Sequence, residues 1–206
     1  MSKVHVITDT DSSLPVALAK QHGIVQVPIT IQFDNDTYET GVNIDDELLF
    51  KKIDALKKLP STAAPSPAAF AKVYKEAFDS GAESIICLVV SSKISRTYDS
   101  AIGAAEEFPA KKISVIDTET LSLCEGFMAL AAAEAVHKGA THEEAVQAAK
   151  DLMPRMHLYG SLTTLKYLAM GGRIGTMAAN MANLFDIRPI MTMIEGKLGL
   201  LEKVRT

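Results

Sequence analysis

The stretch Ser84-Ile85-Ile86-Cys87-Leu88-Val89-Val90 decides the fold class. It is a nearly continuous apolar run that ends at Ser91-Ser92, which is typical of a strand buried on both faces of a parallel sheet. Parallel neighbours need long crossover connections, usually helices. The stretch therefore predicts an α/β fold with helices on either side of it along the chain.

Strand and helix patterns alternate around this run. The expected strands cover 4–7, 25–33, 84–90 and 113–117, and the expected helices begin after Ser12-Ser13 and cover 45–56, 66–79, 97–108, 127–137 and 141–153. Asp34-Asn35-Asp36 predicts a turn, and Thr141 with Glu144 forms a capping-box pattern. This alternation predicts a doubly wound parallel α/β/α domain over residues 1–154.

After Pro154 the pattern changes. Residues 155–206 predict a strand over 156–162, short helices over 165–170 and 176–184, and a hairpin of 189–194 with 198–204 around Glu195-Gly196-Lys197. Because a two-stranded hairpin is marginally stable by itself, we expect 155–206 to be part of a second, incomplete α/β lobe.

Composition excludes several classes of protein. The chain has 206 residues, 48% of them hydrophobic and 22% charged, with a formal net charge of −4, as in an ordinary globular protein. No cluster of Lys and Arg alternates with aromatic residues, so nucleic acid is not an expected partner. The longest apolar stretch, 127–136, contains Glu134 and is far shorter than the ~20 residues of a membrane helix.

Neither a metal nor a cofactor is expected. The five histidines are scattered, and the sequence has no P-loop and no GxGxxG motif. Cys87 and Cys124 lack CxxC spacing and are expected to be reduced core thiols. Since the N-terminal residues also lack a signal-peptide pattern, the sequence predicts a cytoplasmic protein.

Hydroxyl-bearing residues gather where the predicted strands end. They occupy Thr8–Ser13, Ser91–Thr97 and Asp117–Ser122, with Ser61-Thr62 before another helix. Ligands of open α/β sheets bind beyond the carboxyl ends of the strands, and hydroxyl donors near helix N-termini suit a carboxylate or a phosphate. The alternative is that these residues only cap helices and form turns. A serine nucleophile, as in a hydrolase or transferase acting on a small anionic substrate, also stays open.

The same segments resemble the DegV family of bacterial fatty-acid-binding proteins. The resemblance covers essentially the whole chain and is carried by residues 7–15, 61–67, 90–101, 115–118, 171–175 and 203–206. Ala63, Ala64, Lys93 and Arg96 depart from the residues common in the family. Members of the family usually continue past the position of Thr206, and a histidine from that region joins their head-group site.

The resemblance implies a carrier that is not an enzyme. It would bury a long-chain fatty acid between its domains and hold the carboxylate through Thr62 and Ser92, with Ser91, Ser95 and Thr97 as neighbours. The resemblance also implies that the carrier presents the bound acid to a separate fatty acid kinase, which makes an acyl-phosphate for phospholipid synthesis. Arg173 and, less directly, Arg205 would contact that kinase.

Overall fold

The computed structural model describes residues 3–163, 165–173 and 187–205. Its largest sheet has four parallel strands in the order β2-β1-β6-β7. These strands are β1 (Val4–Asp9), β2 (Ile24–Val27), β6 (Ser84–Val89) and β7 (Lys112–Asp117). Every side chain of β6 is buried, so the predicted central strand and the α/β class are confirmed.

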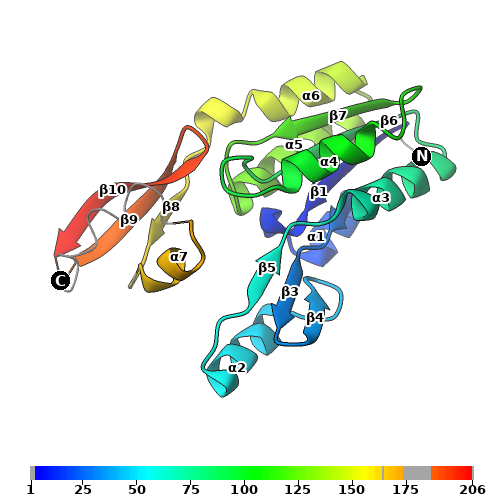
Figure 1. Ribbon diagram of the computed structural model, residues 1–206. Helices are drawn as coiled ribbons and strands as arrows, with labels where there is room; N and C mark the ends of the chain where they lie inside the picture. Colours follow the sequence, from blue (N-terminus) through cyan, green and yellow to red (C-terminus); the bar gives the residue numbers. More distant parts are fainter. Residues whose placement is uncertain (1–2, 164, 174–186, 206) are drawn as a thin grey trace.

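Helices cover both faces of this sheet (Figure 1). They are α1 (Val16–Gln21), α3 (Pro67–Asp79), α4 (Thr97–Ala105), α5 (Leu123–His137) and α6 (His142–Lys150). Ile86 and Leu88 of β6 point to α5 and α6, whereas Ile85, Cys87 and Val89 point to α3 and α4. Each buried Ile or Leu stabilises the fold by roughly 1.5–3 kcal/mol, which explains why this strand is apolar on both faces.

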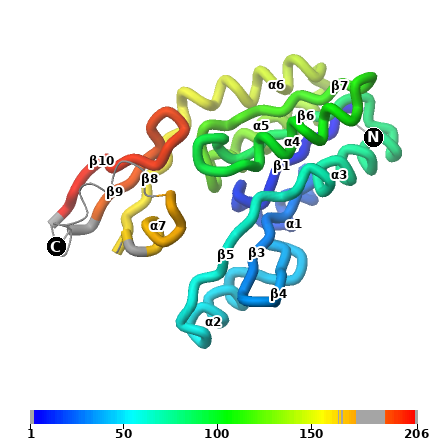
Figure 2. The backbone as a smooth tube through the Cα atoms, in the orientation of Figure 1, coloured from blue at the N-terminus to red at the C-terminus, as the bar shows by residue number. Residues whose placement is uncertain are grey.

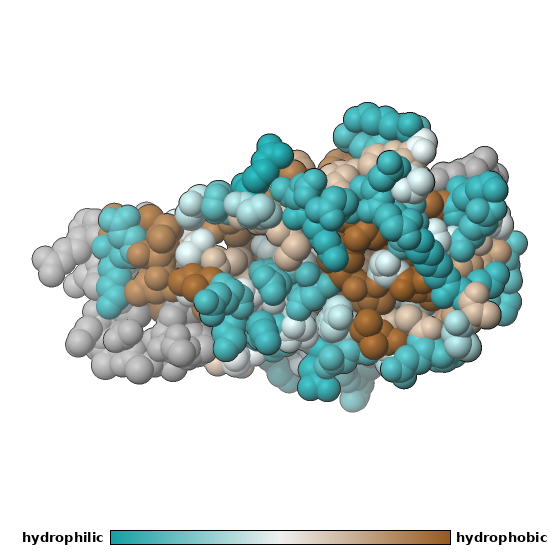
Figure 3. Space-filling model, turned by 90° about the horizontal axis from the view of Figure 1, so that it is seen from above, coloured by the Kyte–Doolittle hydropathy of each residue, from teal (hydrophilic) through white to brown (hydrophobic). Residues whose placement is uncertain are grey.

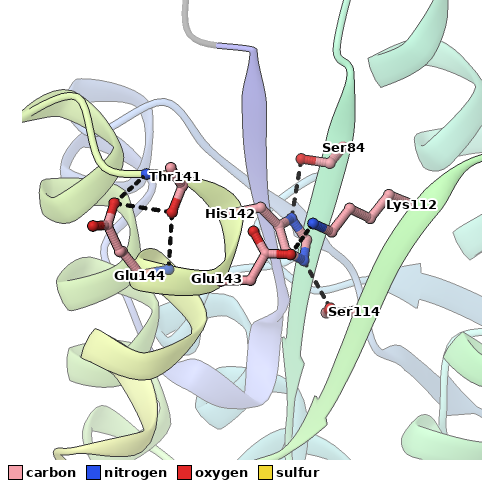
Figure 4. A network of polar contacts seen from close by, with 7 residues as sticks. All are labelled: Ser84, Lys112, Ser114, Thr141, His142, Glu143 and Glu144. Atoms are coloured by element: carbon pink, nitrogen blue, oxygen red, sulfur yellow. Dashed lines mark hydrogen bonds and ion pairs between the residues drawn. The ribbon is translucent and has the colours of Figure 1, made fainter.

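The first turn of α6 ties this helix to β6 and β7 (Figure 4). The Thr141 hydroxyl accepts from the Glu144 N–H at 3.3 Å, and the Glu144 carboxylate accepts from the Thr141 N–H at 2.8 Å, which confirms the predicted capping box. The ring nitrogens of His142 lie 2.7 Å from Ser114 Oγ and 3.0 Å from Ser84 Oγ. His142 is therefore a buried histidine whose hydrogen bonds are satisfied within the core.

A small-sheet lobe is inserted between β2 and α3. It consists of β3 (Thr30–Phe33), β4 (Asp36–Glu39), α2 (Asp46–Leu56) and β5 (Ser61–Ala63), and its antiparallel strands have the order β4-β3-β5. The prediction of one strand over 25–33 is wrong. Pro28 has no N–H for a strand ladder, and the next N–H, of Ile29, donates to Thr10 Oγ1 at 2.9 Å instead. The chain therefore leaves the parallel sheet at Pro28.

The hairpin lobe follows α6 and a short 3-10 helix, Met153–Arg155. It consists of β8 (Tyr159–Ser161), α7 (Lys166–Met170), β9 (Ile187–Ile194) and β10 (Lys197–Arg205), with strand order β10-β9-β8. Glu195 and Gly196 both have positive φ, 48° and 77°, which confirms the predicted hairpin turn. The helix predicted over 176–184 lies outside the described residues, and the division into domains 1–154 and 155–206 stays a prediction.

Packing between α5 and the loop after β1 leaves no room for a side chain at Gly126. A Cβ there would lie 2.7 Å from the Ser12 carbonyl oxygen and 2.9 Å from carbons of Leu14. We therefore expect Gly126→Ala to lower the free energy of unfolding in urea by about 2 kcal/mol. Gly103→Ala, where a Cβ meets nothing within 4 Å, is the matched helix control and should be neutral or slightly stabilising. Equal stability of both variants would contradict this packing.

Candidate functional site

A cleft of about 680 Å³ lies where the parallel domain, the small-sheet lobe and the hairpin lobe meet. Its volume is within the ~300–1,000 Å³ that small-molecule sites usually occupy. The lining side chains include Asp11, Val90, Ile94, Ser95 and Leu121 from the strand-end loops, Ile29, Ile31, Leu49, Ile53 and 59–64 from the small-sheet lobe, and Tyr167, Leu168, Met170, Arg173 and Leu198 from the hairpin lobe.

The cleft walls are mainly apolar. In the small-sheet lobe, Ile31 of β3 is buried, and Leu49 and Ile53 of α2 pack beside it. In the hairpin lobe, Leu168 and Leu198 pack on the buried Leu165 and also line the cleft. Such walls suit an apolar ligand, because burying its surface releases water from both sides of the contact.

Thr62 brings a hydroxyl to this apolar wall. It lies directly opposite Ile31 in the β3–β5 pairing, so both residues share one face of the small sheet. Its side chain is exposed and makes no hydrogen bond to any residue that the structure describes. Thr62 can therefore donate a hydrogen bond to a ligand without breaking one within the protein.

The loop after β6 carries the other predicted hydroxyls. Ser95 lines the cleft, and its Oγ lies 2.8 Å from Oγ1 of the buried Thr97. Ser92 is half-buried beside them, and its N–H donates to Asp117 Oδ1 at 3.2 Å. Ser91 is completely buried and donates its hydroxyl proton to the Gly196 carbonyl at 2.6 Å. Thr62 and Ser95 thus line the cleft, whereas Ser92 and Thr97 lie in the same loop as Ser95 without lining it, and Ser91 faces the hairpin turn.

Arg173, predicted as a contact for a partner protein, lines the cleft. Its Nη1 donates to the Gly171 carbonyl oxygen at 2.6 Å, and its positive charge acts on the Asp11 carboxyl across the cleft. Arg205 is the last described residue of β10, and its side chain lies outside what the structure describes.

Three acidic residues at this end of β1 were missed as a group by sequence reasoning. Asp9 is fully buried and accepts from the N–H groups of Asp11 at 2.7 Å and Val90 at 3.0 Å, so it holds the end of β6 in place. Glu125, also fully buried, accepts from the Thr8 hydroxyl at 2.9 Å. Placing the start of the alanine-rich helix at Leu123 rather than Phe127 would have revealed Glu125.

Burial makes these three carboxyl groups weaker acids than ordinary Asp and Glu side chains. It raises the pKa of Asp9 to about 7, and the negative charge of Asp11 adds to the rise. It raises the pKa of Asp11 to about 6, although Arg173 acts in the opposite direction. The pKa of Glu125 is also raised well above its ordinary value by burial and by Asp9. This group of three carboxyl groups therefore carries less negative charge at neutral pH than its sequence suggests.

The described part of the chain gives little indication of a metal site, of a nucleophilic Ser91 or Ser95, or of a membrane span. Within residues 3–163, 165–173 and 187–205, no group of three His, Cys, Asp or Glu side chains is arranged to hold a metal ion. The Ser91 and Ser95 hydroxyls contact a carbonyl and a hydroxyl rather than an imidazole base. Both cysteines are free and buried, and no helix in these ranges is long and apolar enough to cross a membrane.

The family model described as "Uncharacterised protein, DegV family" matches residues 3–206. The chain belongs to the DegV family. A DegV domain-containing protein of Streptomyces coelicolor is 36% identical over 203 residues, which cover 98% of this chain and 72% of that protein. The resemblance noted in the sequence is therefore confirmed over nearly the whole chain.

Solved structures that share this fold include proteins described as binding fatty acids. A DegV protein from Thermus thermophilus, described by its fatty acid binding, has a TM-score of 0.90 and 33% identity, with all of this chain and 72% of that chain covered. A stearic-acid-binding protein from Eubacterium ventriosum has a TM-score of 0.88 and 27% identity, with all of this chain and 71% of that chain covered.

Proposed function

We propose that this protein is a carrier that binds a long-chain fatty acid in the cleft between its lobes. The observation that carries the proposal is the apolar cleft of about 680 Å³, which is lined by the hydroxyls of Thr62 and Ser95. Two structural neighbours of this chain are described as binding a fatty acid. The acyl chain would lie against Ile31, Leu49 and Leu198, which gives ~0.8 kcal/mol per buried methylene group before the costs of association.

The carboxylate of the ligand needs hydrogen-bond donors because a buried charge without partners is strongly unfavourable. In the proposed site Thr62 donates from β5, and Ser92 donates from the loop after β6. Ser95 and Thr97 keep that loop in shape through their hydroxyl pair. Hydrogen bonds to a charged acceptor are shorter and about twice as strong as neutral ones, so two hydroxyls contribute a large part of head-group affinity.

The charge of Asp11 bears on the same site. With a pKa of about 6, Asp11 is mostly ionised at neutral pH and repels a bound carboxylate, and this repulsion disappears as the pH falls below 6. Arg173, which also lines the cleft, adds a positive charge of the sign that a fatty acid requires.

The proposal includes the fate of the bound acid. The carrier would not change the ligand itself but would present its carboxylate to a separate fatty acid kinase. Arg173, exposed beside the head-group end of the cleft, and Arg205 are the proposed contacts for that partner. A cytoplasmic site of action stays part of the same proposal.

Native mass spectrometry of the purified protein, followed by denaturation and organic extraction, tests the carrier function. We expect the folded protein to carry a noncovalent fatty acid that is released unmodified on denaturation, while the denatured chain has its sequence mass. An empty protein that also fails to take up added stearate would overturn the proposal. An acyl adduct that persists on Ser92 or Ser95 would instead indicate a serine nucleophile.

A further inference from the structure

The turn of the β9–β10 hairpin contacts the parallel domain, and one residue of that turn, Gly196, is buried there. Ile194 and Glu195 are exposed on one side of Gly196, and Lys197 is exposed on the other, whereas Gly196 itself is buried. Figure 3 shows apolar side chains exposed over this lobe, at the left. Figure 2 shows that tip reaching the loops that follow β6 and β7.

A socket made by those two loops receives Gly196. The Ser91 hydroxyl donates to the Gly196 carbonyl at 2.6 Å, and the Lys93 N–H donates to Ser91 Oγ at 3.3 Å. A Cβ on Gly196 would lie 2.9 Å from Ser91 Oγ and 3.2 Å from Lys93 Cγ. Gly196 also has a φ of 77°, which side chains rarely adopt. Only glycine fits this position without displacing Ser91.

Ser91 joins the hairpin to the loop proposed to hold the carboxylate. Its side chain binds Gly196, while its backbone carbonyl accepts from the N–H groups of Ile94 at 3.0 Å and Ser95 at 3.1 Å. Ile94 and Ser95 both line the cleft, as does Leu198, two residues beyond Gly196. One buried serine therefore contacts both the hairpin turn and the part of the loop after β6 that lines the cleft.

We propose that Gly196 seated on Ser91 is a latch that couples the position of the hairpin lobe to the order of the 91–97 loop. Ser91 is then a positioning residue that holds the carboxylate-binding loop in place and does not itself touch the ligand. The effect of the latch on ligand release rests on the proposed fatty-acid function. The coupling itself does not, because it belongs to the ligand-free protein.

Amide hydrogen exchange in ligand-free protein tests the coupling in both directions. Ser91→Ala should make the amides of 194–199 exchange faster by about 5- to 10-fold, the effect expected for the loss of one hydrogen bond. Gly196→Ala should speed exchange of the 92–97 amides by a similar factor, because coupling between two sites is reciprocal. Gly160→Ala, in the same sheet with open space around its Cβ, is the control and should change neither region.

The amides of β6 report whether a variant still folds, and they should keep their protection in every variant. Faster exchange confined to the mutated side, or no change on either side, would overturn the latch. Faster exchange in both regions with β6 unchanged supports it.

Stearate release tests the consequence for the ligand. We expect Ser91→Ala to speed dissociation of stearate by about 5- to 10-fold with a smaller change in the association rate. Ser92→Ala should also speed release but leave the hairpin amides unchanged, which separates a ligand contact from a positioning residue. An unchanged release rate in Ser91→Ala would overturn the link between latch and ligand. Failure of the unmutated protein to bind stearate would reject the proposed function, while the exchange data would still decide the latch.

Discussion

Stearate binding is expected to weaken by at least about 30-fold when Thr62 and Ser92 are both replaced by alanine. The two hydroxyls come from different lobes, Thr62 from β5 and Ser92 from the loop after β6. If each donates a charge-assisted hydrogen bond to the carboxylate, their removal costs ~2–6 kcal/mol, because the buried charge is left without donors. Titration calorimetry with delipidated protein measures the loss.

Matched controls make this result specific. Thr37→Ala in β4 and Ser100→Ala in α4 remove the same hydroxyls from positions outside both the cleft lining and the 91–97 loop, and both should leave affinity unchanged. The single variants Thr62→Ala and Ser92→Ala should each show part of the loss. Wild-type affinity in the double variant would reject these two residues as the carboxylate site.

Stability of the ligand-free protein is expected to fall by about 3 kcal/mol between pH 5 and pH 8 because of Asp9. Its pKa is near 3.8 in the unfolded chain and about 7 in the folded one, so the folded state binds the proton more tightly. The resulting stabilisation is fully present below the unfolded pKa and is lost as the pH rises toward 7. Asp11, with a folded pKa of about 6, acts in the same direction.

Urea denaturation across this range measures the fall, and comparison with Asp9→Asn isolates the part due to Asp9, because Glu125, whose pKa is also raised, acts in the same direction. Burial lowers the pKa of His5 and His142, so these two groups act in the opposite direction and make stability rise as the pH passes through their unfolded pKa of 6.5. About 1 kcal/mol of the fall due to Asp9 should remain between pH 6.5 and pH 8. Asp11→Asn should flatten the curve mainly below that interval. An equal pH dependence of stability in Asp9→Asn and in the unmutated protein would mean that Asp9 is ionised throughout.

Local sequence determined the parallel domain. The run Ser84–Val90 is apolar at every position but its first, and only a strand covered on both faces can bury such a run. The capping box at Thr141 and the turn at Glu195-Gly196 were also readable, because caps and tight turns depend on neighbouring residues alone. The same local logic failed at 25–33, where alternation continues across Pro28 but the strand does not.

Only part of the candidate site could be predicted from the sequence. Ser61-Thr62 and Ser91–Thr97 stood out as hydroxyl-rich segments, and the structure brings Thr62 and Ser95 to one cleft. The sequence could not distinguish Ser91 from Ser92, because the difference lies in a contact with Gly196, more than a hundred positions away.

The sequence by itself thus determined the α/β class, the family and the segments that carry hydroxyls, because periodicity, caps and motifs are properties of neighbouring residues. Tertiary structure alone decided which hydroxyls face the cleft, why Gly196 must be glycine, and that Asp9, Asp11 and Glu125 share one buried region. Hydrogen-bond partners and burial depend on segments distant along the chain, and these long-range contacts set the geometry and the charge of the site.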